Sequence, residues 1–186
     1  MRSHPTRWYV ITGAPCAGKT SVIRELARRG HPVVEETARS YIEERLAAGE
    51  TLAAIRADEL AFESEILRRK VHLEAALSPG RPTFLDRAVP DSTAYFMAAG
   101  LDTAPCERPS RRVRYAGVFL LERLRLDADP VRIEDDRAAA RLEGLIAEVY
   151  RRLGYTPIRV PLWPVQQRVD HILTLVAQDP PSPERV

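Results

Sequence analysis

The chain of 186 residues contains few cysteines, few lysines and no long apolar run. Its two cysteines, Cys16 and Cys106, are far apart, and no signal peptide is recognisable, so we expect a reducing, cytoplasmic setting without disulfides. No apolar run approaches the roughly 18 residues that a membrane helix needs, so we expect no membrane span. Lysine and arginine number 28 against 26 aspartates and glutamates, a net charge of +2. This balance gives no overall attraction to nucleic acid, and we expect none as a partner.

Alternating strand and helix patterns fill most of the chain. Short apolar, β-rich runs at 8–12, 32–36, 83–85, 115–121 and 157–162 are separated by segments with helical spacing. This order predicts an α/β fold, with a parallel sheet covered by helices on both faces. We expect a single domain over residues 1–178 and a flexible tail over residues 179–186, which are rich in proline.

One motif between the first strand and the first helix carries specific chemistry. Residues 13–20 read GAPCAGKT, the phosphate-loop (P-loop) pattern of glycine, four residues, glycine, lysine and threonine. Such a loop directs main-chain N–H groups at phosphate oxygens, and lysine and threonine add a cation and an Mg²⁺ ligand. Lys19 is one of only two lysines in a chain that otherwise uses arginine. The predicted nucleotide-binding residues are Gly13, Ala14, Pro15, Cys16, Ala17, Gly18, Lys19, Thr20 and Ser21.

Charged residues follow the second and third strands, where ligands bind to a parallel sheet. Asp86 is positioned to help Thr20 hold Mg²⁺. Glu35 and Glu36 end the second strand, and one of them must point away. We favour Glu36 as general base and acceptor ligand, with an ion pair to an arginine as the alternative.

Three further residues are candidates for acceptor binding. Arg39 lies one helical turn beyond Glu36. Arg87 follows Asp86 and is either a phosphate or acceptor ligand or a solvated side chain. Asp91 is an acceptor ligand or, as we favour, a helix cap.

The charged segment 122–136 resembles a lid, followed by a helix over 137–153. Arginines on a lid that closes over a triphosphate would stabilise the transition state and exclude water. We predict this role for Arg132 and Arg137.

Five motifs together resemble a known family, the P-loop proteins related to the nicotinamide-riboside kinase domain of the bacterial NAD regulator, often described as AAA-type ATPase domains. They are GAPCAGKT at 13–20, EETAR at 35–39, FLDRAVPDSTAY at 84–95, VRIEDD at 131–136 and QRVDHIL at 167–173. The resemblance implies a three-layer P-loop NTPase sandwich with a lid and a five-stranded sheet of order 2-3-1-4-5. It also implies that Arg168 lies near the adenine. It does not specify the acceptor.

These features predict an ATP- and Mg²⁺-dependent phosphotransferase acting on a hydroxyl of a small molecule. Lys19, Glu36, Asp86, Arg132 and Arg137 would carry the reaction. The alternative is a nucleotide-binding switch with slow hydrolysis and a protein partner. A ring-forming motor ranks third, because the short chain has no room for the extra helical domain. The sequence does not specify the oligomeric state.

Overall fold

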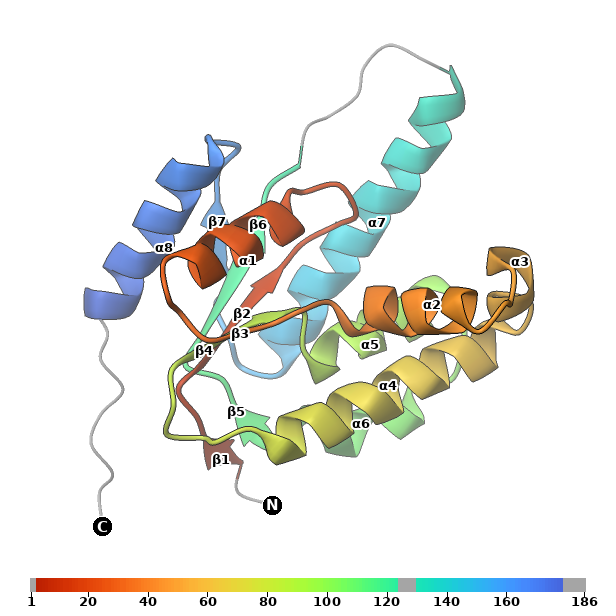
Figure 1. Ribbon diagram of the computed structural model, residues 1–186, viewed down its shortest axis with the longest axis horizontal. Coiled ribbons are helices and arrows are strands. Elements are labelled where there is room, and N and C mark those ends of the chain that lie inside the picture. The colour runs from red at the N-terminus through yellow and green to blue at the C-terminus, as the bar shows by residue number, and fades with distance from the viewer. Residues whose placement is uncertain (1–2, 124–129, 179–186) are drawn as a thin grey trace.

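The computed structural model describes residues 3–123 and 130–178, and for residues 130–135 the backbone alone. Its main sheet has five parallel strands in the spatial order β3-β4-β2-β6-β7 (Figure 1). When the five strands of this sheet are numbered in chain order, their spatial order is 2-3-1-4-5, which is the predicted order. The strands are β2 (Trp8–Thr12), β3 (Val33–Val34), β4 (Thr83–Asp86), β6 (Gly117–Leu121) and β7 (Ile158–Val160).

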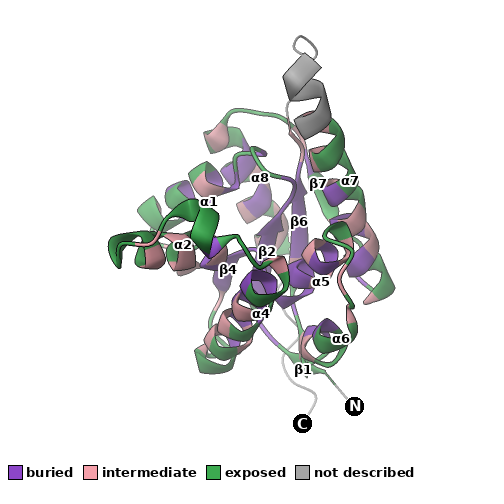
Figure 2. Cartoon of the chain, turned by 90° about the vertical axis from the view of Figure 1, so that its right-hand side faces the viewer, coloured by how far each residue is buried: buried purple, intermediate pink, exposed green. Residues whose placement is uncertain are grey.

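Helices cover both faces of this sheet, because alternate side chains of a strand point to opposite faces. Tyr9 and Ile11 of β2 pack in the cluster that includes α1 and α8, whereas Trp8 and Val10 pack in the cluster that includes α5 and α7. The central strands of this sheet, 8–12, 83–86 and 117–121, are accordingly among the most buried segments (Figure 2). The covering helices are α1 (Lys19–Arg28), α5 (Val89–Ala98), α7 (Pro130–Arg152) and α8 (Val165–Gln178).

The other helices form a lateral group beside the β3 and β4 edge of the sheet (Figure 1). Helix α4 packs against both α2 and α5, and α6 packs against α5. This group consists of α2 (Thr37–Ala47), α3 (Leu52–Ile55), α4 (Glu59–Ala76) and α6 (Ala104–Ser110).

Two features differ from the sequence-based expectation. A second, two-stranded parallel sheet pairs β1 (His4–Pro5) with β5 (Val113–Arg114), and strands this short have no periodicity to detect. Helix α7 begins at Pro130 rather than Arg137. Proline is favourable at the first helical position, so part of the segment predicted as a lid is the start of a helix. The rest of that lid, residues 124–129, and the predicted tail lie outside the described residues.

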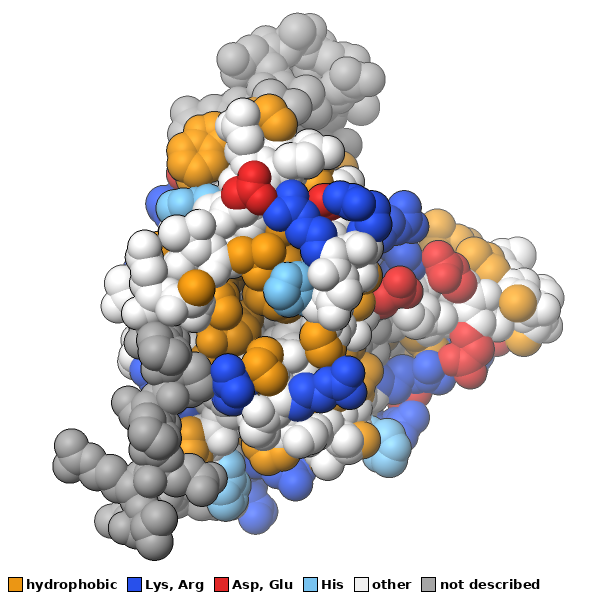
Figure 3. All heavy atoms as spheres, turned by 60° about the vertical axis from the view of Figure 1, so that its left-hand side comes forward, with side chains coloured by type: hydrophobic (Ala, Val, Ile, Leu, Met, Phe, Trp, Pro, Cys, Tyr) orange, Lys and Arg blue, Asp and Glu red, His pale blue; other side chains and the backbone are white. Residues whose placement is uncertain are grey.

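Two surface properties bear on possible partners. No helix in the described ranges combines the length and apolarity needed to cross a membrane. Basic and acidic side chains are interspersed on the face shown in Figure 3, in keeping with the net charge of +2.

Candidate active site

The P-loop connects β2 to α1 and has a tightly curled backbone. Gly13 and Gly18 have φ values of 143° and 82°, and Cys16 has a φ of 61°. A Cβ atom on Gly13 would lie 2.7 Å from the Leu121 carbonyl oxygen of β6. Glycine is therefore required at position 13 both for conformation and for space. Within the loop, Ala14 and Ala17 are buried, and Pro15, Cys16 and Gly18 are exposed.

Lys19 opens α1 and folds back across the loop. Its Nζ donates a hydrogen bond to the Ala14 carbonyl oxygen at 2.8 Å, and the residue is 6% exposed. Burial, aided by the positive charge of Arg87, lowers the pKa of Lys19 to about 8. Thr20 is half-buried on the first turn of α1, and Ser21 is exposed. The cation thus lies at a helix N-terminus, where phosphate binding is favourable.

Asp86 ends β4 beside the P-loop strand, paired in register with Ile11 of β2. It is 2% exposed, and its Oδ1 atom is buried without a hydrogen-bond partner. Burial raises the pKa of Asp86 to about 6, and the charge of Glu36 adds to this rise. A buried carboxylate oxygen without a donor is costly unless a ligand satisfies it. Divalent cations prefer oxygen ligands, so this donor set fits Mg²⁺.

Arg87 connects the P-loop to Glu36. Its Nε donates to Glu36 Oε1 at 2.9 Å, and its Nη1 donates to the Gly13 carbonyl oxygen at 2.9 Å. Arg87 is 5% exposed and adopts a φ of 66°, a left-handed conformation that is strained for a residue with a side chain. The alternative of a solvated Arg87 is therefore wrong.

Glu36 precedes α2, with its carboxylate turned to Arg87. Burial acts to raise the pKa of Glu36, but the charges of Arg87 and Lys19 and the hydrogen bond from Arg87 outweigh it and lower that pKa. The carboxylate therefore stays ionised and able to accept a hydrogen bond at neutral pH. Glu35 is exposed and does not line the cavity that Glu36 lines.

Asp91 is completely buried and bonded within the protein. Its carboxylate accepts hydrogen bonds from the Thr12 hydroxyl, from Tyr150 Oη at 2.6 Å and from the Ala88 main-chain N–H at 2.9 Å. Asp91 is thus the third residue of α5 and caps this helix through its bond to Ala88, the N-cap residue. It is not available as an acceptor ligand, because its oxygens already have donors.

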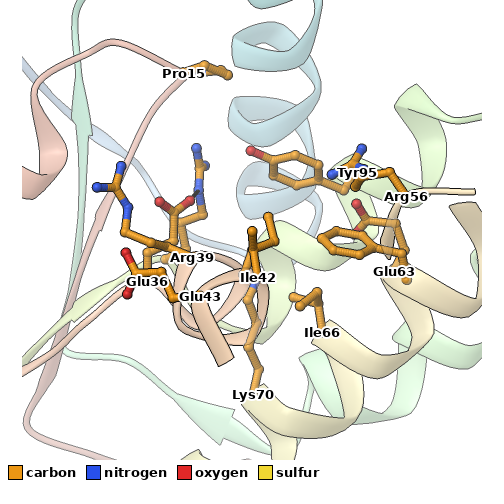
Figure 4. Close-up of a pocket in the computed structure, with 13 residues that line it drawn as sticks. Pro15, Glu36, Arg39, Ile42, Glu43, Arg56, Glu63, Ile66, Lys70 and Tyr95 are labelled. Carbon is orange, nitrogen blue, oxygen red and sulfur yellow. Dashed lines mark hydrogen bonds and ion pairs between the residues drawn. The ribbon is translucent and has the colours of Figure 1, made fainter. Parts of the chain in front are cut away.

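A cavity of about 500 Å³ opens next to the P-loop. Figure 4 shows Glu36, Arg39 and Glu43 toward one end and Arg56, Glu63 and Tyr95 toward the other, with Lys70 below. The volume is within the range of small-molecule sites. Its lining residues are Pro15, Glu36, Ala38, Arg39, Ile42, Glu43, Arg56, Phe62, Glu63, Ile66, Lys70, Arg87 and Tyr95.

Arg168 lies on α8 and makes three hydrogen bonds to main-chain carbonyl groups. Its guanidinium donates to Ala17 at 2.7 Å, to Glu122 at 2.9 Å and to Pro161 at 2.9 Å. These bonds connect the P-loop to the segments that follow β6 and β7. Burial lowers the pKa of Arg168. Its described contacts indicate that it supports the P-loop backbone.

The three remaining predicted residues are placed as follows. Arg39 is exposed on α2 and lines the cavity together with Glu36. Arg137 is exposed on α7 and does not line this cavity. The Arg132 side chain lies outside the described part of the structure.

Sequence reasoning missed the wall of the cavity formed by α4 and α5. Phe62, Ile66 and Lys70 are spaced four residues apart on α4, and Glu63 lies on the same helix. One signal was present, because Lys70 is the other lysine of the chain and falls on an apolar helical stripe.

A family model described as an AAA domain matches residues 8–168. The chain belongs to this AAA domain family. The match runs from the start of β2 to Arg168 and so includes every strand of the main sheet. No curated protein matches this AAA domain protein.

Several solved structures, among them two kinases, share the fold of this AAA domain. The crystal structure of NadR protein in complex with NR has 17% identity and a TM-score of 0.68, with coverage of 97% of this chain and 53% of that one. The present chain thus spans about half of that protein. Thymidylate kinase from Ehrlichia chaffeensis has 13% identity and a TM-score of 0.64, covering 93% and 99% of the two chains. Deoxyadenosine kinase from M. mycoides has 13% identity and a TM-score of 0.61, covering 92% and 99%.

Proposed function

We propose that this AAA domain protein is an ATP- and Mg²⁺-dependent phosphotransferase that moves the γ-phosphate of ATP to a hydroxyl of a small, nucleoside-like molecule. The observation that carries the proposal is the cavity beside the P-loop, which both Pro15 and Glu36 line. A phosphate held by the loop and a hydroxyl held at Glu36 would then be neighbours. Proximity of this kind is the main source of catalysis in phosphoryl transfer.

The P-loop and its cation would bind the triphosphate. The main-chain N–H groups of the P-loop, from all of residues 13–18 except Pro15, and the Lys19 ammonium would supply hydrogen bonds and positive charge to phosphate oxygens. Thr20 and Asp86 would hold Mg²⁺, which supplies charge neutralisation to the phosphates when bound. The unpartnered Oδ1 of Asp86 supports this assignment.

Glu36 and Arg87 would organise the acceptor end of the reaction. Glu36 accepts the proton of the attacking hydroxyl, and its lowered pKa keeps it ionised for this purpose. Arg87 holds the Glu36 carboxylate and the Gly13 carbonyl at 2.9 Å each, and so fixes the acceptor end relative to the P-loop. Arg39 lies with Glu36 on the same cavity. Arg132 and Arg137, both within the range of α7, stay the predicted cations for the transition state.

The cavity favours this function over a nucleotide-binding switch, which needs no acceptor site. ADP release should be measured with Mg²⁺ and ATP against a panel of nucleosides, sugars and other hydroxyl compounds. An acceptor should raise the rate above basal hydrolysis. If no compound does so, the assignment as a phosphotransferase is wrong.

The substitution Glu36→Gln tests the base directly. It should leave ATP binding unchanged and lower transfer to the acceptor by about 100-fold or more, as expected for loss of a general base. The exposed neighbour supplies the matched control, because Glu35→Gln should change neither quantity. Equal transfer rates in the Glu36 variant and the unmodified protein would remove Glu36 from this role.

A further inference from the structure

Glu63 is a buried carboxylate that nothing in the preceding reaction uses. It lies on α4, is 3% exposed and lines the cavity. Within the described chain, Glu63 makes no hydrogen bond or ion pair, whereas Glu36 is bonded to Arg87 at 2.9 Å. The nearby ammonium of Lys70 donates instead to Ser92 Oγ at 3.2 Å. The carboxylate oxygens of Glu63 can therefore accept hydrogen bonds from a molecule bound in the cavity.

The Glu63 residue is almost entirely removed from solvent. Burial raises the pKa of Glu63, and the charge of Lys70 only partly opposes that rise. A buried polar group without a partner costs free energy, and a charged hydrogen bond is stronger than a neutral one. A bound molecule with hydrogen-bond donors at this point would remove the cost.

The surrounding side chains restrict the shape of such a molecule. Phe62, Ile66 and Tyr95 supply apolar and aromatic surface to the cavity. Glu63 extends from α4 toward the side on which Tyr95 lies, at the end opposite Glu36 (Figure 4). Guanidinium groups lie over two of these rings, Arg56 at 4.2 Å from the Phe62 centroid and Arg87 at 5.1 Å from the Tyr95 centroid. A wall of mixed apolar and cationic character suits a heterocycle, which has an apolar face and carries N–H donors on its edge.

We propose that Glu63 determines acceptor specificity by accepting hydrogen bonds from an N–H donor group, such as an exocyclic amine, on a heterocyclic acceptor. The acceptor thus has two recognised ends, a hydroxyl at Glu36 and a nitrogen donor at Glu63. This inference rests on the proposed phosphotransferase function.

Matched pairs of nucleosides test the inference. Adenosine and cytidine carry an exocyclic amine, and purine riboside and pyrimidin-2-one riboside lack it. At least one amine-bearing member should be a better acceptor than its partner, with kcat/KM for ADP release higher by about 10- to 100-fold, the usual contribution of a hydrogen bond to a charged group.

The variant Glu63→Leu should abolish this preference while leaving ATP binding, measured by calorimetry with Mg²⁺, unchanged. Because an apolar side chain replaces an unpartnered carboxylate, the melting temperature should stay the same or rise. If Glu63 served only as a structural partner of Lys70, its replacement by leucine would instead lower the melting temperature. The control is Glu65→Leu on the outer side of the same helix, where Glu65 pairs with Arg68 and Arg69. That control should keep the preference.

These experiments distinguish failure of the inference about Glu63 from failure of the proposed phosphotransferase function. If nucleosides or sugars are phosphorylated with no preference for an amine, or if Glu63→Leu retains the preference, the inference about Glu63 is wrong and the phosphotransferase function stands. A preference for acceptors whose donors are hydroxyl groups alone would also overturn it. If no compound of any class raises ADP release, the proposed function fails, and the inference fails with it.

Discussion

Lys19 combines a buried position with a lowered pKa of about 8, and this is the arrangement expected of a cation that awaits an anion. Its hydrogen bond to the Ala14 carbonyl oxygen holds the ammonium over the loop. Arginine, which the chain uses almost everywhere else, would present a planar fork at this point in place of a compact point charge.

The substitution Lys19→Ala should weaken Mg²⁺-ATP binding by about 10- to 100-fold, because hydrogen bonds to charged groups contribute about 1.5–3 kcal/mol. Isothermal calorimetry measures this change. The exposed Arg24 on the same helix provides the control, and Arg24→Ala should bind ATP normally. Unaltered affinity in the Lys19 variant would exclude this lysine from phosphate binding.

Glu74 gives the protein a stability that depends on pH. On α4, it accepts hydrogen bonds from the Val89 main-chain N–H at 2.9 Å and from Tyr115 Oη at 2.9 Å. Burial raises the pKa of Glu74 to about 7 from the ordinary value of 4.5. A carboxyl whose pKa is higher in the folded state stabilises the fold below pH 4.5, and this contribution is lost as the pH rises toward 7.

Unfolding by denaturant at pH 4.5 and pH 7.5 measures this effect. The unmodified protein should lose about 3 kcal/mol more of its unfolding free energy over this range than Glu74→Gln, since one pKa unit corresponds to about 1.4 kcal/mol. Glu65 is a suitable control, because Arg68 and Arg69 lower its pKa to about 2 and it stays ionised throughout. Identical pH profiles for Glu74→Gln and the unmodified protein would contradict the assignment.

At the scale of elements, the junction of β2, the P-loop and β6 depends on Gly13. Alanine there would meet the Leu121 carbonyl oxygen at 2.7 Å and would also adopt a φ of 143°. Gly49, at the end of α2, has a φ of 91° and nothing within 4 Å of an added Cβ atom. Alanine substitutions at Gly13 and Gly49 therefore distinguish the cost of backbone strain, present at both positions, from the cost of a steric clash, present only at Gly13.

We expect Gly49→Ala to cost about 1 kcal/mol from conformational strain alone. Gly13→Ala should cost more and should also weaken ATP binding, because either the loop or β6 must move. Chemical denaturation and ATP titration of both variants test this comparison. Equal stability losses with normal ATP binding would show that the loop tolerates the added methyl group.

Local patterns in the sequence predicted some elements well and others poorly. Periodicity and glycine placement identified β2, the P-loop and α1, because their signals lie within a few residues of one another. The two-residue strands β1 and β5 and the start of α7 at Pro130 were missed. The bonds of Arg168 to three carbonyl groups could not be foreseen, since main-chain acceptors leave no mark in the sequence.

At the scale of the whole molecule, the parallel sheet brings together residues that are distant in sequence. The segments that follow β2, β3 and β4 supply Lys19, Glu36 and Arg87, and all three belong to one connected group of contacts. This convergence follows from strand direction and was predictable. The α4 wall of the cavity was not, because it depends on how α2, α4 and α5 pack against one another.

The most direct test of the account follows the γ-phosphate itself. The protein is incubated with Mg²⁺, ATP labelled in the γ-phosphate and the best acceptor of the panel, and the products are separated after a single turnover. The account predicts that most of the label is attached to the acceptor, and that Glu36→Gln greatly slows its appearance there. Label found in inorganic phosphate alone, at a rate that no acceptor changes, would contradict the central claim that the cavity and the P-loop together transfer a phosphoryl group.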